Sequence, residues 1–339
     1  MIDLRNIPPL PGNMPEHREE IKQLLSGEMY GSVSDYSFEY ERTIKSYGAE
    51  TYYVRVKGKG GAHEFSFGLW LPEKGQQKYP VIVYLTGAGF MAADIPLAML
   101  EANGFAVAAC YANEIEPDEP TGYPKGLGKA IGTADVRPGA LAAWAEGLII
   151  AASILKEHEN IDGKNMIVAG CSRFGKAALW AGAKHERFSA VVSFDSGCGG
   201  AAINRGKRDE RISDMVRSFP HWLSPNMKKY IGDEAAIPFD QHFLLSLIAP
   251  RKLLVTSSTK DPYCDPYSEF LGLAYASRAY EDYGKQGIGT FVQPPSGKLL
   301  IGDGAAYYLR EGNHGVEKED WTALIEFCRP VPHFIYELL

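Results

Sequence analysis

The strongest signal for chemistry in this sequence is a serine that stands between glycines. Ser172 lies in the segment Gly-Cys-Ser-Arg-Phe-Gly, which follows an apolar run at 166–169 and leads into an Ala-rich segment. A strand, a tight turn and a helix in this order are typical of a nucleophile elbow, where small neighbours let the serine hydroxyl stand clear of the sheet. Backbone N–H groups of the turn and the helix N-terminus then face a developing oxyanion. The segment predicts Ser172 as a nucleophile for acyl transfer.

The glycine spacing around Ser172 departs from the GxSxG pattern that is usual for such turns. Gly170 stands two residues before the serine, but Phe174 occupies the second glycine position and Gly175 comes one residue later. Serine is also a common helix N-cap, so a structural role for Ser172 is the alternative. The residues further along the chain favour the catalytic role.

A serine hydrolase with this turn needs an acid and then a histidine downstream. His314 lies in a polar loop, Glu-Gly-Asn-His-Gly, ahead of a predicted helix at 321–327, and we predict that it is the general base. His242 comes before the apolar run at 252–256, which is too early for that order. We therefore expect His242 to be structural or to face the substrate.

Two positions are open for the acid. Asp261 follows the run at 252–256, which is the usual place for a triad acid, whereas Asp195 ends the run at 190–194. The acid only has to orient the imidazole and stabilise its cation, so either position can serve. The plainer alternative is that each aspartate caps a turn.

Two further features can stabilise an oxyanion. Arg173 follows the serine directly, where its guanidinium can donate to the oxyanion or bind a carboxyl-derived substrate. An ordinary salt bridge on the helix is the alternative. The Gly-rich segment 86–90 closes an earlier apolar run, and in this fold such a loop commonly donates the second backbone N–H, although a simple tight turn would use the same glycines.

These side chains need a sheet to position them. Short apolar runs alternate with helical segments, which is the pattern of a parallel sheet that is buried on both faces. The runs are 81–85, 105–109, 166–169, 190–194 and 252–256, and the longest helical segment is 139–155. Alternation at 52–56 and 65–71 adds an antiparallel hairpin around a turn at 58–61. We predict an α/β fold with three layers, helices on both sides of a mostly parallel central sheet.

One sheet crosses all of these segments without a linker, so we expect a single domain at 1–339. Residues 1–45 are rich in proline and charge, with one helical candidate at 17–25, and we expect them to form an N-terminal arm packed on that domain. No internal repeat, coiled coil or low-complexity tract divides the chain.

The composition is that of a folded globular chain and excludes several classes of function. Hydrophobic residues make up 45% and charged residues 23%, and the net charge of −7 comes without a basic stripe, so we expect no nucleic-acid partner. No apolar run reaches the roughly 18 residues that a spanning helix needs, and the N-terminus lacks a signal-peptide pattern. We expect a soluble chain without a membrane partner, in a compartment that the sequence leaves undetermined.

The five cysteines are an odd number, widely spaced, and include no CxxC pair. They are Cys110, Cys171, Cys198, Cys264 and Cys328. Such spacing indicates neither a zinc site nor a disulfide scaffold, although it leaves room for one disulfide. We expect no metal and no organic cofactor.

Taken together and in order, four segments resemble motifs of the glucuronoyl esterases, a carbohydrate esterase family with the α/β-hydrolase fold. Residues 170–176 resemble its GCSRxGK nucleophile motif, and 195–200 resemble its acidic-residue-SGxGG segment. Residues 261–266 resemble DxWADP, and 312–314 resemble the histidine loop. The stretches Phe-Asp-Gln-His at 239–242 and Leu-Ile-Ala-Pro-Arg at 247–251 also match, and the bacterial branch is the closer one.

Such enzymes cleave the ester between glucuronic acid side chains of xylan and alcohol groups of lignin. The resemblance implies a serine carboxylesterase that acts on (4-O-methyl-)glucuronoyl esters through an acyl-enzyme, and that needs no cofactor. The roles it implies are nucleophile for Ser172, base for His314 and oxyanion donor for Arg173. The family places its acid either early or late, so the resemblance leaves both Asp195 and Asp261 in place, with redundancy between them.

The resemblance also implies a sugar-binding role for Lys176 and Glu210. Tyr263 replaces the tryptophan of DxWADP, which alters stacking on the sugar, and Trp222 matches a segment of bacterial members but can equally belong to the core. Gly315 follows the histidine where fungal members have a cysteine bonded to the one before the serine, so residue 171 is expected to remain a thiol. Members of the family are usually secreted or periplasmic.

Two other functions remain open. Arg173 and Lys176 suit a polar sugar acid better than a lipid, which would call for an apolar lid. An esterase for acetylated sugars or other small esters would share the same triad without selectivity for uronates. A noncatalytic carbohydrate-binding protein on a hydrolase scaffold is the third reading, but it would be expected to lose the serine or the histidine.

Overall fold

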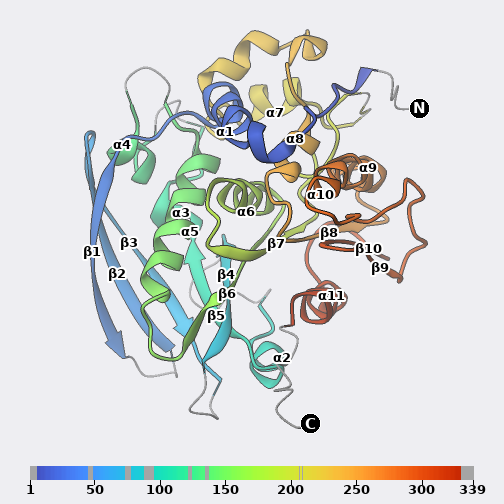
Figure 1. Cartoon of the computed structure of the whole chain (residues 1–339). Helices are drawn as coiled ribbons and strands as arrows, with labels where there is room; N and C mark the ends of the chain where they lie inside the picture. The colour runs from blue at the N-terminus through green and yellow to red at the C-terminus, as the bar shows by residue number, and fades with distance from the viewer. Residues whose placement is uncertain are drawn as a thin grey trace, which may run out of the picture.

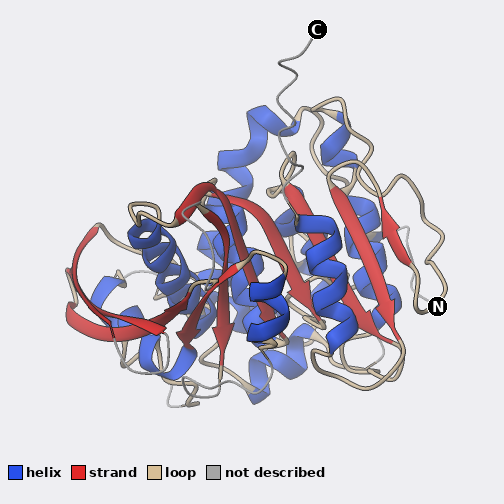
Figure 2. Ribbon diagram, turned by 90° about the horizontal axis from the view of Figure 1, so that it is seen from below, coloured by secondary structure: helices blue, strands red, loops and turns tan. Residues whose placement is uncertain are grey.

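The computed structural model describes residues 6–44, 49–72, 78–87, 95–120, 124–133, 137–205, 207 and 209–329. Within them, ten strands form one sheet in the order β1-β2-β3-β5-β4-β6-β7-β8-β10-β9 (Figure 2). The strands are β1 (Tyr36–Ile44), β2 (Ala49–Gly58), β3 (Gly61–Trp70), β4 (Tyr79–Thr86), β5 (Ala106–Tyr111), β6 (Ile161–Cys171), β7 (Phe188–Phe194), β8 (Lys252–Ser258), β9 (Leu299–Ile301) and β10 (Ala305–Arg310).

The helices connect these strands and cover the sheet. They are α1 (Met14–Leu25), α2 (Leu97–Ala102), α3 (Ala112–Ile115), α4 (Leu127–Ile131), α5 (Ala140–Leu155), α6 (Arg173–Lys184), α7 (Ile212–Ser218), α8 (Gln241–Ser246), α9 (Pro266–Ala276), α10 (Arg278–Glu281) and α11 (Lys318–Cys328), with short π or 3-10 segments η2 (Ser26–Tyr30), η3 (Pro225–Tyr230) and η4 (Glu234–Ala236). No helix in the described part of the chain is both long and apolar enough to cross a membrane.

The centre of the sheet is parallel. Strands β5, β4, β6, β7, β8 and β10 lie side by side and all run the same way. Their residues are almost all buried, because both faces of the sheet are covered and Val, Ile, Leu and Ala fill both sides. Four of the five predicted apolar runs lie entirely within one of these strands, and the run 105–109 begins one residue before β5, which confirms the predicted parallel sheet.

Helices cover both faces of the sheet, so the predicted three layers are confirmed. Helices α5, α6, α8 and α9 pack on one face, and α2 and α11 pack on the other (Figure 1). Helix α5 is buried almost throughout because alanine and aliphatic side chains surround it on all sides. It lies within one residue of its predicted bounds at each end.

An antiparallel wing of β1, β2 and β3 extends one edge of the sheet. The hairpin of β2 and β3 confirms the prediction from 52–56 and 65–71. Strand β1 corrects the expectation for residues 1–45, because 36–44 belong to the sheet and pair with β2 along their whole length. The alternation in β1 is weak since it is an edge strand, and its Phe38 and Tyr40 remain 38% and 46% exposed.

The N-terminal helix ties the start of the chain to the domain. Helix α1 includes the predicted 17–25 and starts three residues earlier, and it buries Met14, Ile21 and Leu25. The Arg18 guanidinium donates hydrogen bonds to the main-chain oxygens of Leu247 and Ala249. This part of the predicted arm therefore packs against the segment that precedes β8.

Strand β10 was not predicted, although it carries the histidine loop. It pairs in parallel with β8 from Ala305 to Arg310, so the sheet continues well beyond residue 256, where the apolar runs end. Its two tyrosines and terminal arginine interrupt the aliphatic pattern. Both tyrosines are nevertheless buried, because the ring of Tyr307 packs against Phe270 of α9 and its hydroxyl donates to the Pro266 main-chain oxygen.

Candidate active site

Four of the predicted site residues meet at the carboxyl edge of the parallel sheet. Ser172 follows β6, Asp195 follows β7, Asp261 lies shortly after β8, and His314 lies in the loop after β10. These strands are consecutive neighbours in the sheet and all run in the same direction. The carboxyl ends of parallel strands are where ligand sites of open α/β sheets lie. The fold therefore brings the serine, both aspartates and the histidine to one edge.

Ser172 has the backbone of a nucleophile elbow. Its φ of 56° and ψ of −128° lie where residues with a Cβ are strained. Its N–H donates to the Phe194 main-chain oxygen at 2.9 Å, which holds the turn against β7. Ser172 precedes α6, but its side chain makes no capping hydrogen bond. The hydroxyl is thus not used as a helix cap, which removes the structural alternative for this residue.

The shifted glycine of the elbow has a steric reason. A Cβ on Gly170 would lie 2.4 Å from the Phe174 main-chain oxygen, and a Cβ on Gly175 would lie 2.9 Å from the Gly170 oxygen. The strand and the helix therefore need glycine at 170 and 175. Phe174 has room because its ring packs edge-on against Trp144 at 5.5 Å. The pattern GxSxxG thus allows the same close approach of strand and helix that GxSxG allows.

The Gly-rich segment 86–90 reaches the same elbow at its start. A Cβ on Gly87 would lie 3.0 Å from the Phe174 ring, so Gly87 lies close to the elbow. Residues 88–90 fall outside the described residues, and with them the predicted second oxyanion N–H.

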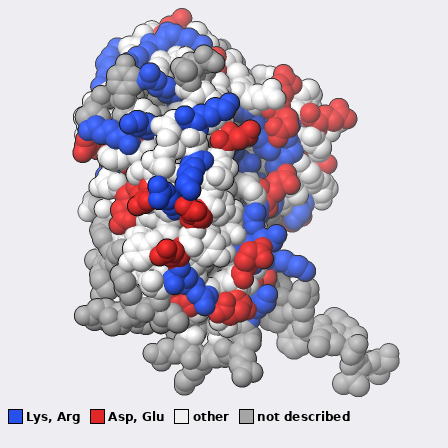
Figure 3. All heavy atoms as spheres, turned by 90° about the vertical axis from the view of Figure 1, so that its left-hand side faces the viewer, with Lys and Arg blue, Asp and Glu red and all other residues white. Residues whose placement is uncertain are grey.

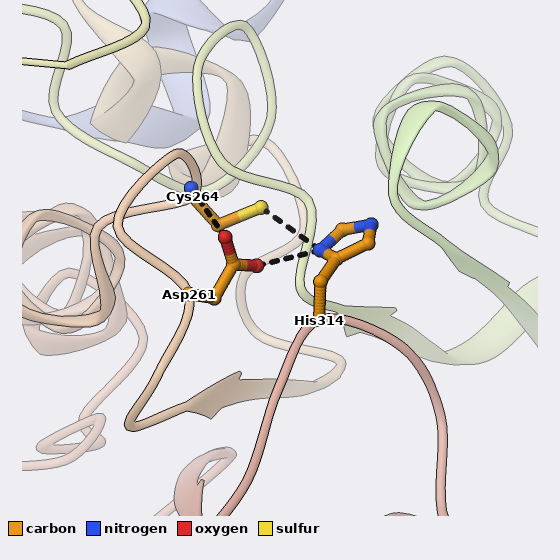
Figure 4. A group of neighbouring side chains, drawn as sticks. All are labelled: Asp261, Cys264 and His314. Atoms are coloured by element: carbon orange, nitrogen blue, oxygen red, sulfur yellow. Dashed lines mark hydrogen bonds and ion pairs between the residues drawn. The ribbon is translucent and has the colours of Figure 1, made fainter.

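His314 and Asp261 form a hydrogen-bonded pair. The Nδ1 atom of His314 lies 2.5 Å from Oδ2 of Asp261, whose side chain is only 2% exposed (Figure 4). A carboxylate can only accept, so Nδ1 carries the proton and the other ring nitrogen is left as the base. That nitrogen points away from Asp261 in Figure 4, while the His314 side chain is 45% exposed. The pair thus has the tautomer that a general base requires.

The electrostatics of the pair favour its charged form. The hydrogen bond to Asp261 raises the pKa of His314 above its ordinary value, although burial opposes this, and the charges of Asp261 and Asp195 add to the increase. Burial would raise the pKa of Asp261, but hydrogen bonds from His314 and Cys264 lower it to about 2. Asp261 therefore stays ionised, and its charge stabilises the protonated form of His314.

Asp195 touches the histidine loop without touching the imidazole. It is 1% exposed, and its Oδ2 accepts hydrogen bonds from Ser258 Oγ at 2.6 Å and from the Gly315 N–H at 3.0 Å. Burial raises the pKa of Asp195 to about 6. Of the two acids that the sequence left open, Asp261 is thus the one placed to orient the imidazole, and Asp195 supports the loop that carries it.

Arg310 is a site residue that sequence reasoning missed. Its side chain is 5% exposed and donates through Nε to Asp320 Oδ2 at 2.7 Å. Its Nη2 donates to the main-chain oxygens of Asn313 at 2.8 Å and Gly315 at 2.9 Å, on either side of the histidine. It also lies 3.6 Å from Asp195 Oδ2. Arg310 therefore fixes the shape of the histidine loop, and no local pattern signals that role.

Arg173 is held by a second missed residue, Asp118, in the loop between α3 and α4. Nε of Arg173 lies 2.9 Å from Asp118 Oδ2, and the other carboxylate oxygen accepts from His221 at 2.8 Å and Trp222 at 2.7 Å. The guanidinium lies 5.7 Å from the Trp222 ring. Burial opposes ionisation of Asp118, but these partners hold its pKa below the ordinary value. Arg173 thus forms a salt bridge, as the alternative to an oxyanion role expected, but its partner Asp118 lies on another loop and not on the helix.

The predicted sugar-binding residues separate into buried and exposed ones. Lys176 is 3% exposed and donates to the Ser196 main-chain oxygen at 2.6 Å, while Trp222 is 4% exposed and stacks on Phe219 at 3.9 Å. Both side chains are buried, and the burial of Trp222 favours the core alternative. Tyr263 is 69% exposed, and Glu210 is half-buried without a hydrogen bond or ion pair to any residue that the structure describes.

His242 is structural in this fold. It is 1% exposed, and its Nε2 lies 2.9 Å from the Pro8 main-chain oxygen. Burial lowers the pKa of His242 to about 4, so it stays neutral. This agrees with the expectation that it comes too early in the chain to act as the base. It joins the N-terminal segment to α8.

Cys264 is the third residue that the sequence did not single out. Its Sγ lies 3.5 Å from His314 Nδ1 and 3.0 Å from the Asp195 main-chain oxygen, and its N–H donates to Asp261. Together, Asp261, Cys264 and His314 present an oxygen, a sulfur and a nitrogen within 4.8 Å of one another. All five cysteines are thiols, which includes Cys171 next to the nucleophile. These donor atoms include a thiol and an imidazole, which are ligands of soft and borderline metal ions, although the sequence has no CxxC pair that would indicate a metal site.

A pocket of about 680 Å³ lies elsewhere, on the outer face of the antiparallel wing. Glu39, Tyr53, Glu64 and Glu114 are among the residues that line it. Its lining includes neither the serine, the histidine nor the two aspartates of the site described above. This pocket is therefore separate from the residues that carry the chemistry.

Comparison with known proteins places the chain in a family. A family model described as glucuronyl esterase of fungi matches residues 54–284, which is more than half of the chain. Carbohydrate esterase MZ0003 of an unknown prokaryotic organism is 38% identical over 67% of this chain, and the 4-O-methyl-glucuronoyl methylesterase of Hypocrea jecorina is 30% identical over 70%. The matched segments cover 54% and 52% of those two proteins, so the chain spans about half the length of these relatives.

Solved structures agree with this assignment. The glucuronoyl esterase from Solibacter usitatus has a TM-score of 0.80 and 31% identity, with 92% of this chain and 91% of that chain covered. A promiscuous CE15 esterase from a marine bacterial metagenome has a TM-score of 0.79 and 30% identity, with 92% and 90% covered. With a matching family model, relatives of this similarity and the same fold, the chain belongs to the glucuronoyl esterase family.

Proposed function

We propose that the chain is a serine carboxylesterase that hydrolyses glucuronoyl esters. The observation that carries the proposal is the His314–Asp261 pair, 2.5 Å apart, at the same sheet edge as a serine on a strained elbow. A serine, a base and an orienting acid in this order and on this fold are the parts of an acyl-transfer enzyme. A noncatalytic binding protein would not be expected to keep a serine in a strained backbone conformation when its side chain does not cap the helix.

The arrangement supports acyl transfer in two steps. In the first, Ser172 Oγ attacks the ester carbonyl while the unprotonated nitrogen of His314 takes its proton, and the alcohol leaves with that proton. The resulting oxyanion faces the N-terminus of α6 and the Arg173 guanidinium, which is 39% exposed. In the second step, His314 activates a water that releases the uronic acid and restores Ser172. Asp261 stabilises the imidazolium in both steps.

The choice of a uronate ester rests on charge and on the relatives. Arg173 brings a partly exposed cation next to the nucleophile, which suits a sugar acid, whereas Lys176 is buried and bonds to the Ser196 main-chain oxygen. The Hypocrea jecorina relative is called a 4-O-methyl-glucuronoyl methylesterase. We propose that the substrate is a (4-O-methyl-)glucuronic acid ester, with the uronic acid carried by xylan and the alcohol by a lignin fragment. Tyr263 is 69% exposed and directly precedes Cys264, so it offers an aromatic surface in the loop that carries Asp261.

A broader esterase is the second candidate. The marine metagenomic relative is described as promiscuous, and it covers nearly all of this chain at 30% identity. The buried position of Trp222 leaves fewer aromatic surfaces to select a sugar ring. Turnover of acetyl or small aryl esters at rates comparable to the uronate ester would favour this reading.

The test is the release of benzyl alcohol from benzyl glucuronate, measured beside the hydrolysis of 4-nitrophenyl acetate under the same conditions. We expect preferential cleavage of the glucuronate, lost in Ser172→Ala and retained in a control, Ser189→Ala, whose hydroxyl bonds to the Met166 main-chain oxygen away from the site. Turnover of the acetate alone would identify the broader esterase. Absence of turnover on both esters would contradict the proposal and favour a binding protein.

A further inference from the structure

We propose that Asp261, Cys264 and His314 form an inhibitory binding site for a soft divalent cation such as Zn²⁺ or Cd²⁺. The inference rests on the proposed function, since the cation would act on the base of that reaction. The three side chains belong to the loops that follow β8 and β10, and Figure 4 shows them pointing toward one another. A carboxylate oxygen, a cysteine sulfur and an imidazole nitrogen are each ligands that zinc uses in proteins.

The spacing of sulfur and nitrogen fits a tetrahedral metal. Two ligands about 2.3 Å and 2.0 Å from zinc, at a tetrahedral angle, lie about 3.5 Å apart. The Sγ atom of Cys264 and Nδ1 of His314 are 3.5 Å apart. Only the carboxylate has to move, because its Oδ2 lies 2.5 Å from Nδ1 and a shared metal would separate these atoms to about 3.3 Å. A water molecule can supply the fourth ligand.

The thiol is held in place before any metal binds. Nζ of Lys207, a residue that is 2% exposed, donates to the main-chain oxygens of Tyr263 at 2.9 Å and Cys264 at 3.2 Å. The Cys264 N–H also bonds to Asp261. The loop therefore fixes sulfur and carboxylate with respect to each other, so a metal has little ordering to impose. Access is from the imidazole side, where His314 is 45% exposed.

The chemistry explains why binding would inhibit. The metal takes the lone pair of Nδ1 and the sulfur of Cys264, and the thiol proton and the Nδ1 proton are displaced. One proton goes to the second ring nitrogen of His314 and one to solvent. The metal-bound imidazole then carries its proton on the nitrogen that should accept the proton of Ser172, so the general base is lost. Asp261 becomes a ligand instead of an orienting acid. Hard cations such as Mg²⁺ prefer oxygen ligands and should not act in this way.

The first test does not depend on activity. The full chain, freed of metal with a chelator, is titrated with Cd²⁺, and the ultraviolet charge-transfer absorption of a cadmium–thiolate bond is recorded. We expect one Cd²⁺ per chain in the wild type and in Ser172→Ala. The absorption should be lost in Cys264→Ala and Cys264→Ser, but kept in Cys171→Ala, which removes the other thiol next to the nucleophile. Absorption that survives in both position-264 variants, or that is lost in Cys171→Ala, would overturn the proposal.

The second test measures inhibition relative to the activity of each variant without metal. Zn²⁺ should inhibit ester hydrolysis by the wild type, EDTA should reverse the effect, and Mg²⁺ should have none. Loss of one ligand should raise the inhibitory Zn²⁺ concentration at least about tenfold in Cys264→Ala and Cys264→Ser. Equal inhibition of the wild type and these variants would overturn the proposal. If Cd²⁺ binds as expected but no ester is hydrolysed, the metal site stands and the proposed function fails.

Discussion

The loops that contain Asp195 and Asp261 have the same position in the fold and different roles. Each follows a parallel strand, and β7 and β8 are neighbours in the sheet. Asp261 bonds directly to the imidazole, and its pKa is lowered to about 2, whereas Asp195 bonds to the backbone of the histidine loop and burial raises its pKa to about 6. A carboxylate at a strand end is therefore not enough to identify a triad acid. The group that it faces decides what it does.

Replacement of Asp261 should give the largest loss. In Asp261→Asn the amide can donate to Nδ1 and favour the wrong imidazole tautomer, so kcat should fall by about 10³-fold or more with little change in KM. Asp265→Asn is the matched control, because this aspartate lies in the same loop but bonds to Ser268 at the start of α9. A kcat of Asp261→Asn within tenfold of the wild type would show that Asp195 can replace it.

Arg310 lies near Asp195 and, like Asp195, holds the backbone of the histidine loop. Arg310→Met leaves Asp320 and two main-chain oxygens without their buried donor, and it should lower the free energy of unfolding by about 3 kcal/mol. Urea denaturation measures this loss. Arg310→Lys keeps the charge but not the forked geometry, so it should recover only part of the stability. Full stability in Arg310→Met would contradict the structural role given to this residue.

Asp195→Asn should reduce kcat much less than the change at position 261. The amide oxygen can still accept the hydrogen bonds of Ser258 and Gly315, so the histidine loop keeps its anchor, and we expect a loss of about 30-fold at most. The double variant should be only slightly slower than Asp261→Asn. Strong loss in the double variant with near-normal single variants would instead show that the two acids are redundant.

The opposite pKa shifts of the two acids predict opposite effects of pH on stability. The raised pKa of Asp195 means that its contribution to stability is fully present below about pH 4, the ordinary value, and is lost as the pH rises through about 6. The lowered pKa of Asp261 means that its contribution is present above about pH 4 and is lost as the pH falls through about 2. The stability of the wild type relative to Asp195→Asn should therefore be greatest at about pH 4 and below, and smaller by about 2 kcal/mol near pH 8. Thermal denaturation at both pH values measures the difference, and a constant difference would contradict the shift.

Asp118 is a third carboxylate near the site, and it pairs with Arg173 instead of the histidine or its loop. Asp118→Asn should loosen the guanidinium and reduce kcat about fivefold, a small part of the loss expected for removal of an oxyanion donor. The pH dependence of kcat should not change, because Asp118 bonds to Arg173, His221 and Trp222 and not to His314. A shift of the pH profile would connect Asp118 to the base and contradict this separation.

The sequence predicts the local parts of the site and not the parts made by tertiary contacts. Ser172 and its glycines lie within a few residues, so the strand, turn and helix are visible in the pattern. The choice between Asp195 and Asp261 depends on which of them faces the imidazole, and this distance exists only in the folded chain. Asp118 and Cys264 act on residues of other loops, so no spacing along the chain indicates them. Arg310 lies beside the histidine, but its role depends on burial.

The same distinction applies to the fold. The five apolar runs are continuous because their strands are buried on both faces, so they are visible in the sequence. Strand β1 is an edge strand with polar residues on both sides, and β10 ends in Tyr-Tyr-Leu-Arg, so neither has a continuous apolar run. Neighbouring elements bury the residues of β10, whereas the described residues of β1 stay partly or fully exposed. Sequence patterns therefore identify the centre of the sheet better than its margins.

The two margins of the sheet have a consequence for self-association. Strand β9 has three residues, and β1, at the other end, carries Glu39, Glu41 and Arg42, with Lys57 paired to Glu39 next to it. Figure 3 shows acidic and basic side chains interspersed on the side of the molecule where β1 lies. A very short strand and a charged strand are poor templates for pairing with a second chain. Both margins of the sheet therefore oppose edge-to-edge pairing between copies of the chain when its concentration is high.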